Sequence, residues 1–531
     1  MASTPKLQCS GILLILLGLM NIHWSNEEKI LLVPMPMLNS HWMVEAAIGQ
    51  ALVDKGHVVT AVVEKDIVDK RRAERPDFMF ERFQDHGVGK RLREFQDQVF
   101  VMATPMSITE KHRVLPFLYE SQKEHCNHLL NDEMFGILKT ANYSVVISDP
   151  IFLCGTILAA NISVPYVAIR SAGGIALDKM AEATSVPLPF AYVPSILLDF
   201  TDQMTFLQRV GNVLTFGFSS ISRQWVETGV FDYLASKCLS QKDTIQSLMS
   251  GTDLWLSQTD NVLDFPRPSM PNMVQVGGLT VRIGVPLSEV SDLEGFMQSS
   301  SNDGVVIVSF GSMIGTMSTE KKEIFAAAFA QLRQKVVWRY VGERPTGLGN
   351  NTRLMSWLPQ NDLLAHPKTR AFVTHAGLNG VYEALYHGVP MVCLPQFLDT
   401  PGIAARVVAR GLGVRLDLMT VTSDELSRAI THVLTNNSYR ETAARMSRLY
   451  RDQPQSPMER AVWWIEHVIK HGGLPHLRAR AVDLPFYQYY LLDVAAFLLA
   501  MCSAVLGSVW CSCSLVCRKF CCKTSGKIKS Q

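Results

Sequence analysis

Short apolar runs bounded by turn residues alternate with longer stretches that suit helices along most of this chain. In the first half the runs cover residues 29–34, 58–63, 145–148, 166–169, 254–257 and 274–276, with a helix predicted over 43–55. A second set covers 305–310, 336–340, 353–357, 371–374, 391–394 and 414–416. Between the two sets, residues 282–303 are polar and contain Gly284 and Pro286. This pattern predicts an α/β protein of two successive units, each with a mostly parallel sheet, joined by a linker.

Both ends of the chain carry membrane signals. Residues 11–20 are apolar and follow Lys6, but the run is too short to cross a bilayer, so residues 1–25 are predicted to be a cleavable secretory signal, with a buried strand or helix as the alternative. Residues 494–516 contain no charge and are long enough to span a membrane as a helix. The tail, residues 517–531, is basic, which predicts a cytosolic C-terminus and a lumenal position for everything before the span.

The last lysines of the tail bear on localisation. Lys527 and Lys529 stand fifth and third from the end, which resembles the dilysine retrieval signal of endoplasmic-reticulum membrane proteins. A basic tail that binds anionic lipid is the alternative.

Composition narrows the classes of function. A chain of 531 residues with 47% hydrophobic content can fill the cores of two domains. The net charge of +2 gives no electrostatic footprint for nucleic acid. Four of the 11 cysteines fall in the predicted lumenal part, and such scattered thiols do not predict a disulfide framework: Cys126, Cys154, Cys238 and Cys393. His125 and His128 flank Cys126, but no second ligand pair follows at a suitable spacing, so no metal site is predicted.

Residues 357–399 carry most of the candidate chemistry. Trp357 follows a predicted strand and offers a flat face for stacking a nucleobase, while the Gln360 amide can donate to and accept from a base edge. His375 and Gly377 stand where a parallel strand passes to a helix. Unpaired N–H groups at such a helix start suit a pyrophosphate, and His375 adds a side-chain donor.

The following helix continues this order of contacts. Gly380 lets the backbone approach the phosphates, and Glu383 lies one turn after Asn379, on a face where it can accept two ribose hydroxyls. Asp399 follows the next strand at the same sheet edge and can hold sugar hydroxyls. Each residue alone is more often a packing residue, but together they predict a nucleotide-sugar pocket.

This stretch resembles the signature of the UDP-glycosyltransferases, specifically the membrane-bound vertebrate type. Flanking motifs agree over nearly the whole chain, among them Val308-Ser-Phe-Gly-Ser312, Phe265-Pro-Arg-Pro268 and Tyr489-Tyr-Leu-Leu-Asp493. His375-Ala-Gly-Leu-Asn-Gly-Val-Tyr-Glu383 is closest to the UDP-glucuronosyltransferase branch, whereas Trp357-Leu-Pro-Gln-Asn-Asp-Leu-Leu364 is shared with ceramide galactosyltransferase.

The resemblance implies the GT-B fold, two facing Rossmann-like domains with a cleft between them. We expect an acceptor-binding domain over residues 26–285, a UDP-sugar-binding domain over 286–480, a transmembrane helix over 494–516 and a cytosolic tail over 517–531. Residues 101–117 and 187–200 are rich in Met, Phe, Leu and Pro, which suits a lipophilic acceptor, although such residues are more often core. The sequons at Asn142, Asn161, Asn350 and Asn436 are compatible with a lumenal glycoprotein. Homo-oligomers or hetero-oligomers with related transferases are the expected partners.

Catalysis needs a base in the first domain. His41 follows the first strand and matches the histidine that deprotonates the acceptor hydroxyl in this family; histidine titrates near neutrality. Asp149 ends another strand and matches the carboxylate that orients this histidine. The expected reaction is one displacement with inversion, in which the UDP charge is held by helix N–H groups, His375 and Ser312. No metal and no cofactor besides the UDP-sugar is expected, and a plain helix cap is the alternative role of Ser312.

One departure from the family pattern bears on the donor sugar. Where the family usually has Pro-Leu-Phe-Gly-Asp-Gln, this chain has Pro395-Gln-Phe-Leu-Asp-Thr400. Thr400 lacks the reach of a glutamine amide, and Leu398 replaces a glycine in a loop that needs a permissive backbone. Glucuronic acid is the expected sugar, with glucose, galactose or N-acetylglucosamine and a lipid or steroid acceptor as the alternative. A membrane-anchored partner subunit without turnover is a further alternative.

Overall fold

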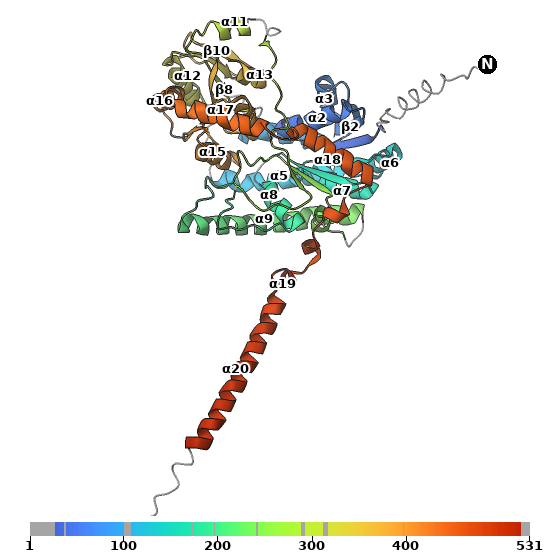
Figure 1. The fold of residues 1–531 in the computed structure, drawn as a ribbon. Coiled ribbons are helices and arrows are strands. Elements are labelled where there is room, and N and C mark those ends of the chain that lie inside the picture. Colours follow the sequence, from blue (N-terminus) through green and yellow to red (C-terminus); the bar gives the residue numbers. More distant parts are fainter. Residues whose placement is uncertain are drawn as a thin grey trace, which may run out of the picture. The chain divides into compact units, whose positions relative to one another are not determined.

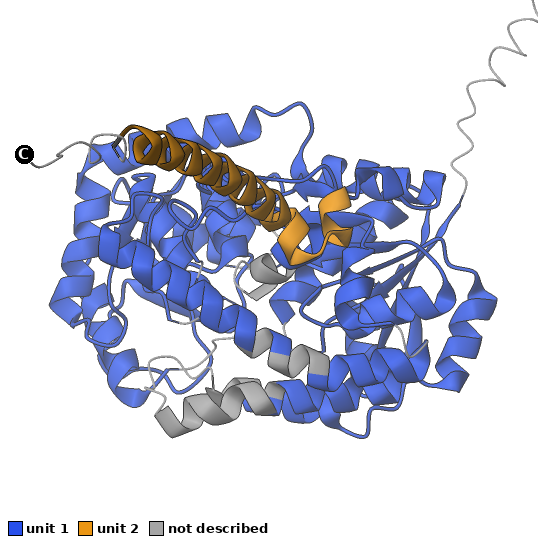
Figure 2. Ribbon diagram, turned by 90° about the horizontal axis from the view of Figure 1, so that it is seen from below, with its two compact units in different colours: residues 1–478 blue, residues 479–531 orange. Residues whose placement is uncertain are grey.

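The computed structural model describes residues 27–36, 39–99, 108–171, 175–195, 197–239, 243–287, 292–311, 317–396 and 398–521. The chain divides into two compact units, Met1–Arg478 and Ala479–Gln531 (Figure 2). The first unit holds two parallel sheets surrounded by helices (Figure 1). The predicted secretory signal, residues 1–25, lies outside the described residues.

The first sheet has, among the described residues, seven parallel strands in the order β3-β2-β1-β4-β5-β6-β7. Their bounds are β1 Lys29–Val33, β2 Val58–Glu64, β3 Met79–Phe83, β4 Val145–Ser148, β5 Tyr166–Arg170, β6 Leu254–Ser257 and β7 Met273–Gln275. Six of them lie on the predicted apolar runs. β3 was not predicted from the sequence, because this edge strand, Met-Phe-Glu-Arg-Phe, buries only Phe83 fully and lacks the continuous apolar run of a central strand.

The second sheet has six parallel strands within the described ranges, in the order β10-β9-β8-β11-β12-β13. They are β8 Val305–Ser309, β9 Lys335–Arg339, β10 Thr352–Met355, β11 Thr369–Thr374, β12 Met391–Cys393 and β13 Gly413–Arg415. All six coincide with predicted runs. In both sheets the chain order reverses beside the first strand of the set, β1 or β8, which is where ligands of open α/β sheets bind.

Helices cover both faces of each sheet, and strand residues alternate between the two cores. In β1, Leu31 packs with the helices of one face, whereas Ile30 and Leu32 pack with those of the other. The helices around the first sheet are α2 Asn39–Val53, α3 Val68–Glu74, α4 Val88–Val99, α5 Ile108–Leu129, α6 Asp132–Ala141, α7 Cys154–Ile162, α8 Ile175–Thr184, α9 Phe206–Cys238 and α10 Ile245–Ser250. Those that follow are α11 Leu293–Gln298, α12 Thr319–Ala330, α13 Gln360–Ala365, α14 Leu378–His387, α15 Thr400–Ala409, α16 Ser423–Thr435 and α17 Asn437–Arg451.

Helix α18, Pro457–His471, returns from the second sheet to the first (Figure 1). Ser456 and Glu459 form a capping box at its start, and Pro457 occupies the first turn. The apolar face of α18 packs against α2 and the first sheet, where Val462 and Ile465 share a core with Ile30. The predicted ranges 26–285 and 286–480 stay predictions, and this helix, which falls in the second range, completes the core of the first sheet.

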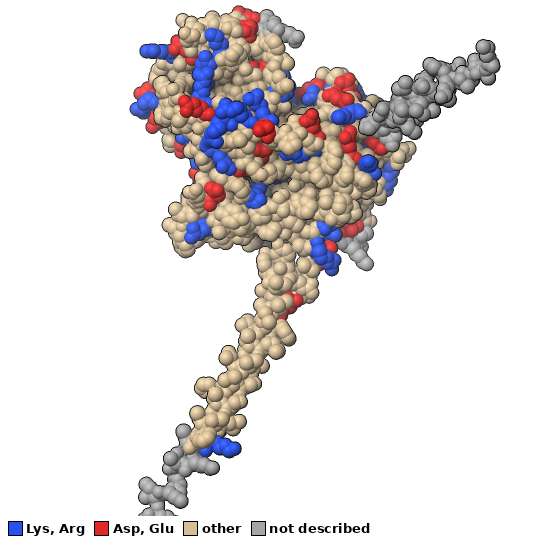
Figure 3. Space-filling view, in the orientation of Figure 1, with Lys and Arg blue, Asp and Glu red and all other residues tan. Residues whose placement is uncertain are grey.

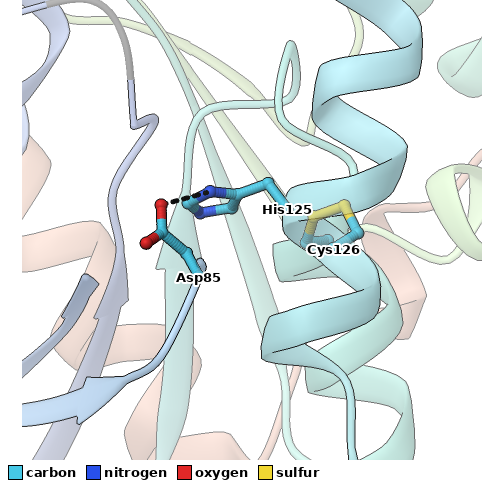
Figure 4. Close-up of a disulfide and its surroundings, with 4 residues drawn as sticks. Asp85, His125 and Cys126 are labelled. Atoms are coloured by element: carbon cyan, nitrogen blue, oxygen red, sulfur yellow. Dashed lines mark ion pairs between the residues drawn. A yellow bond between two sulfur atoms is a disulfide. The ribbon is translucent and has the colours of Figure 1, made fainter. Parts of the chain in front are cut away.

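A disulfide joins α5 to α7 through Cys126 and Cys154 (Figure 4). The four scattered thiols did not predict a disulfide framework, and this pair was not identified from the sequence. The two cysteines are 28 residues apart and meet because α5 and α7 pack on the same face of the first sheet. The separation of two cysteines along the sequence does not by itself predict such a contact. Cys238 and Cys393 are free thiols.

The second unit contains the short turns η3 Arg480–Asp483 and α19 Phe486–Tyr489, followed by helix α20, Leu492–Cys521. Residues 492–520 of α20 are long and apolar enough to cross a membrane, and none of this stretch is buried. Figure 3 shows almost no charged side chain along this described helix before its basic end. The observation agrees with the span predicted over 494–516. Residues 522–531, which carry the predicted retrieval signal, lie outside the described residues.

Candidate active site

A cavity of about 370 Å³ lies between the carboxyl edges of the two sheets. The first half of the chain contributes Ser40, His41, Met43, Ile151, Ser171 and Leu197, and the second half contributes the remaining wall. Most of these residues follow the end of a strand, such as Ser171 after β5 and His375 after β11. Parallel strands carry their carboxyl ends to one edge, so the fold itself gathers these side chains.

His41 and Asp149 form a buried hydrogen-bonded pair at the first-half side of the cavity. His41 lies in the first turn of α2 and Asp149 directly after β4. The two strands β1 and β4 are neighbours, which brings the side chains together. His41 Nδ1 donates to Asp149 Oδ2 at 2.7 Å, and Asp149 also accepts the backbone N–H of Ile151 at 2.9 Å and of Ser171 at 3.3 Å.

The charge state of this pair suits a general base. Burial raises the pKa of Asp149, but the charge of His41, the hydrogen bond from His41 and the two backbone N–H donors outweigh burial and leave that pKa below its ordinary value. Asp149 is therefore ionised at neutral pH and fixes the proton of His41 on Nδ1. The other ring nitrogen, Nε2, is then free to accept a proton, and His41 lines the cavity.

The far wall is built around the start of α14. Gly377, Leu378, Asn379 and Gly380 line the cavity at the N-terminal end of this ten-residue helix, where unpaired N–H groups attract anions. The His375 ring lies between two glycines: a Cβ on Gly311 would stand 2.6 Å from Cε1 of His375, and one on Gly377 would stand 2.5 Å from the same ring. Both positions therefore require glycine on steric grounds, and Gly311 also has φ +78°.

Electrostatics make His375 a neutral donor. Burial, followed by the nearby charge of Arg339, lowers the pKa of His375 to about 4. At neutral pH the ring offers an N–H group and no charge. Arg339, at the end of β9, donates to the Gly311 carbonyl and lies 5.4 Å from the ring centre of Trp357. Trp357 is 54% exposed and lines the cavity, so its ring is accessible for stacking.

A second polar pair joins α13 to α14. Gln360 Nε2 donates to Glu383 Oε2 at 2.6 Å, and both side chains line the cavity. Burial raises the pKa of Glu383 to about 7, against the lowering effect of the hydrogen bond from Gln360. Glu383 therefore exchanges its proton near neutral pH and, when ionised, can accept two hydroxyl groups.

The loop at residues 398–400 has the backbone that the sequence analysis anticipated. Leu398 has φ +54°, a left-handed conformation that a glycine adopts without steric cost. Asp399 precedes α15 and lines the cavity beside Thr400. The Thr400 hydroxyl accepts a hydrogen bond from the backbone N–H of Gln396 at 3.0 Å, so this side chain stabilises the loop that contains it.

The structure brings together nearly all the residues that the sequence predicted. Ten of them line the cavity: His41, Trp357, Gln360, His375, Gly377, Asn379, Gly380, Glu383, Asp399 and Thr400. Asp149 lies behind His41 and is fully buried, and Ser312 lies outside the described residues. Asn379 Nδ2 also donates to the carbonyl of Ser40 at 3.5 Å, which links the two halves of the chain at the cavity.

Several lining residues were not predicted from the sequence, among them Ser171, Arg282, Ser309, Arg339 and Thr374. Four of these five are the last residue of a strand or the residue after it. Their position at strand ends is the signal that could have identified them. Arg282 instead lies in the segment predicted as a linker, and it pairs with Asp362.

A separate buried cluster, Glu64, Asp85 and His125, stands in the first sheet (Figure 4 shows Asp85 and His125). These three could hold a metal ion by their spacing. Arg93 already supplies a positive charge there, with Nη1 3.4 Å from Glu64, and Asp85 accepts the N–H groups of Gly87 and Gly89 at the start of α4. The arrangement fits a structural network that holds α4 and α5 on the sheet.

Solved structures with the same fold define the class. One is titled as the glycotransferase of kitacinnamycin (TM-score 0.58, 18% identity, covering 83% of this chain and 99% of that one). Another is Os79 from O. sativa in complex with UDP (TM-score 0.55, 17% identity, 83% and 100%). Two parallel sheets that face each other across one cavity define the GT-B fold.

The sequence comparisons then give the family. The sequence model of the protein family described as UDP-glucoronosyl and UDP-glucosyl transferase matches residues 28–528 of this chain. Similar proteins include UDP-glucuronosyltransferase 2C1 of Oryctolagus cuniculus, 42% identical over 76% of this chain and 80% of that protein, and UDP-glucuronosyltransferase 2A2 of Homo sapiens, 40% identical over 78% of each. This chain belongs to that family, and it is a glycosyltransferase that takes its sugar from a UDP-sugar.

Proposed function

We propose that this protein transfers glucuronic acid from UDP-glucuronic acid to a hydroxyl group of a small lipophilic acceptor. The observation that carries the proposal is the His41–Asp149 hydrogen bond of 2.7 Å at one wall of the cavity whose opposite wall holds the donor residues. The relatives named UDP-glucuronosyltransferases support the choice of sugar. Met43, Ile151 and Leu197 give the first-half wall an apolar surface, which supports a lipophilic acceptor.

The reaction is one displacement at the anomeric carbon, with inversion. His41 Nε2 takes the proton of the acceptor hydroxyl while its oxygen forms a bond to the anomeric carbon. The bond from that carbon to the phosphate oxygen breaks, and UDP leaves with the electron pair. Asp149 holds the imidazolium that forms.

The leaving group needs no metal and no further cofactor in this proposal. The N–H groups at the start of α14 and the neutral His375 donor face the diphosphate, and Arg339 supplies a positive charge nearby. Ser312 is proposed to add a hydroxyl contact. Gln360 and Trp357 hold the base, Glu383 the ribose, and Asp399 with Thr400 the sugar.

We place the enzyme in the endoplasmic-reticulum membrane as a single-pass protein. Helix α20 spans the bilayer, the sheets are lumenal and the basic tail is cytosolic. The Cys126–Cys154 disulfide supports an oxidising compartment for the first unit.

The loop at residues 398–400 favours a second candidate, transfer of glucose, galactose or N-acetylglucosamine. The Thr400 hydroxyl already accepts a hydrogen bond from the Gln396 N–H, and the threonine side chain is shorter than the glutamine that the family usually has at this position. One contact to the sugar therefore differs from the family pattern. This change bears on the sugar and leaves the base and the diphosphate site as proposed.

The test uses membranes that contain the full chain, a panel of UDP-sugars and a simple phenol, with conjugates measured by mass. The expected product is a glucuronide that disappears in His41→Ala. Transfer of another hexose with the same dependence on His41 favours the second candidate. Measurable UDP binding without transfer from any donor to the phenol favours either an unusual lipid acceptor or a partner subunit without turnover.

A further inference from the structure

Glu45 is a buried carboxyl group directly behind the proposed base. It lies on α2 four residues after His41, so the two side chains share one face of the helix. Glu45 is completely buried, and it does not line the cavity. Neither of its carboxyl oxygens has a hydrogen-bond partner among the described residues. A buried polar group without a partner is costly, which makes this position unusual.

The groups around Glu45 come from four elements. His41 is on α2 itself, Asp149 follows β4, Arg71 comes from α3, and Tyr166 comes from β5. Burial raises the pKa of Glu45 well above its ordinary value, and the negative charge of Asp149 raises it further; the Asp149 backbone N–H and Arg71 oppose this only in part.

The other two neighbours compensate a negative charge on Glu45 only in part or not at all. Arg71 donates to Glu74 Oε2 at 2.8 Å and to Asn39 Oδ1 at 3.0 Å, so its guanidinium is engaged elsewhere. The Tyr166 hydroxyl pairs with Ser148 Oγ at 2.8 Å, and burial raises the pKa of Tyr166 to about 12, so this ring is neutral.

Hydrogen bonding decides which of the two carboxyl groups keeps a proton. Asp149 accepts three hydrogen bonds, from His41 Nδ1, Ile151 N–H and Ser171 N–H, whereas Glu45 has the Asp149 backbone N–H nearby but no hydrogen-bond partner among the described residues. Two buried carboxyl groups that repel each other do not ionise together readily. Asp149 is therefore the ionised member, and Glu45 is the protonated one.

We propose that Glu45 is a positioning residue of this transferase, protonated beside Asp149 at neutral pH, and that loss of its proton in alkaline solution strengthens His41 as a base. A second negative charge behind the imidazole stabilises the imidazolium that forms when the acceptor loses its proton. The inference rests on the proposed roles of His41 and Asp149. It adds to them an alkaline increase in rate that an isolated His–Asp pair does not have.

The experiment measures kcat for transfer from the preferred UDP-sugar to a simple aliphatic alcohol, with the full chain in membranes, from about pH 6.5 to about pH 9.5, a range over which the acceptor hydroxyl does not itself ionise. Glu45→Gln keeps the size of the side chain and removes the ionisation, and Glu45→Met removes both proton and polarity. Asp54→Asn is the matched control, because it neutralises an exposed carboxylate just after α2.

The wild type and Asp54→Asn are expected to show kcat rising about threefold to tenfold over the alkaline range, and both Glu45 variants to lack this rise. KM for the donor should not follow the same titration, since Glu45 lies outside the cavity wall. A flat wild-type profile overturns the inference, as does the same rise in either Glu45 variant. If both variants fail to bind UDP, a flat wild-type profile still overturns the inference.

His41→Ala in the same preparation separates this inference from the proposed function. If His41→Ala retains transfer, the proposed base is wrong, and the inference falls with it. If His41→Ala is inactive and the Glu45 variants keep the wild-type rise, only the inference about Glu45 is wrong.

Discussion

Replacing Gly377 with alanine tests the steric construction of the diphosphate site. A Cβ at this position would stand 2.5 Å from Cε1 and Nε2 of His375, whereas non-bonded atoms of this kind prefer separations of about 3.5 Å. The His375 ring therefore has to shift by about 1 Å. Gly311 also lies close to this ring, since a Cβ built on Gly311 would stand 2.6 Å from it, so the ring has little room to move.

The magnitude follows from the contact that His375 is proposed to make. A hydrogen bond to a charged group contributes about 1.5–3 kcal/mol, so its loss weakens binding about tenfold to hundredfold. The backbone of Gly377, with φ −66° and ψ 139°, is one that alanine adopts without strain. Any loss of UDP affinity in Gly377→Ala would therefore come from the clash with the His375 ring. We expect the Kd for UDP to rise by this factor in Gly377→Ala.

Titration calorimetry of UDP with detergent-solubilised enzyme measures this change. Gly136→Ala is the matched control: Gly136 lies in α6, and a Cβ there meets nothing within 4 Å. This control should bind UDP like the wild type. If Gly377→Ala also binds UDP with wild-type affinity while remaining folded, then His375 does not contact the diphosphate and the proposed arrangement is wrong.

Four other outcomes are expected. Asp149→Asn should lower kcat by about a hundredfold or more with little change in KM for the donor, because Asp149 orients His41 without lining the cavity; an equal loss in KM contradicts this. Glu383, with a pKa of about 7, should bind UDP more tightly as it ionises, so UDP affinity should rise through neutral pH, and Glu383→Gln should abolish that dependence in the same calorimetric titration. Leu398→Gly combined with Thr400→Gln should raise kcat/KM for the preferred UDP-sugar about threefold to tenfold by restoring one sugar contact, and an unchanged donor profile refutes the assigned contact. Because the folded state holds the Glu45 proton more tightly than the unfolded state, the contribution of Glu45 to stability should be lost as pH rises from about 4.5 towards the raised folded pKa, so the unfolding midpoint of the wild type should fall relative to that of Glu45→Gln over that range.

The sequence was sufficient for most of the fold because central parallel strands are buried on both faces. Their continuous apolar runs, such as Val305–Ser309, identify them without any tertiary information. The edge strand Met79–Phe83 lacks such a run, and pairing with β2 alone makes it a strand. Helix α18 shows a similar limit, since its amphipathic pattern predicts a buried face but does not say which sheet covers it.

The donor site was predictable for a related reason. Trp357, His375 and Glu383 lie in one segment, and their order along the chain follows strand ends and a helix start whose chemistry is local. Arg339 was not predicted as a residue of the site because it lies in a separate strand. It reaches Gly311 only because β9 and β8 are neighbours in the sheet.

By itself, the sequence determined the two α/β units, the apolar C-terminal helix and the residue types of the nucleotide-sugar pocket, because periodicity and local motifs are properties of neighbouring residues. The tertiary structure alone decided what meets over long separations: the Cys126–Cys154 disulfide, the contact of Asn379 with Ser40 across the cavity, and the burial of Glu45 behind Asp149. Such contacts depend on which strands are neighbours and which helix faces the sheet. These relations are set by packing of the whole chain, and no local pattern encodes them.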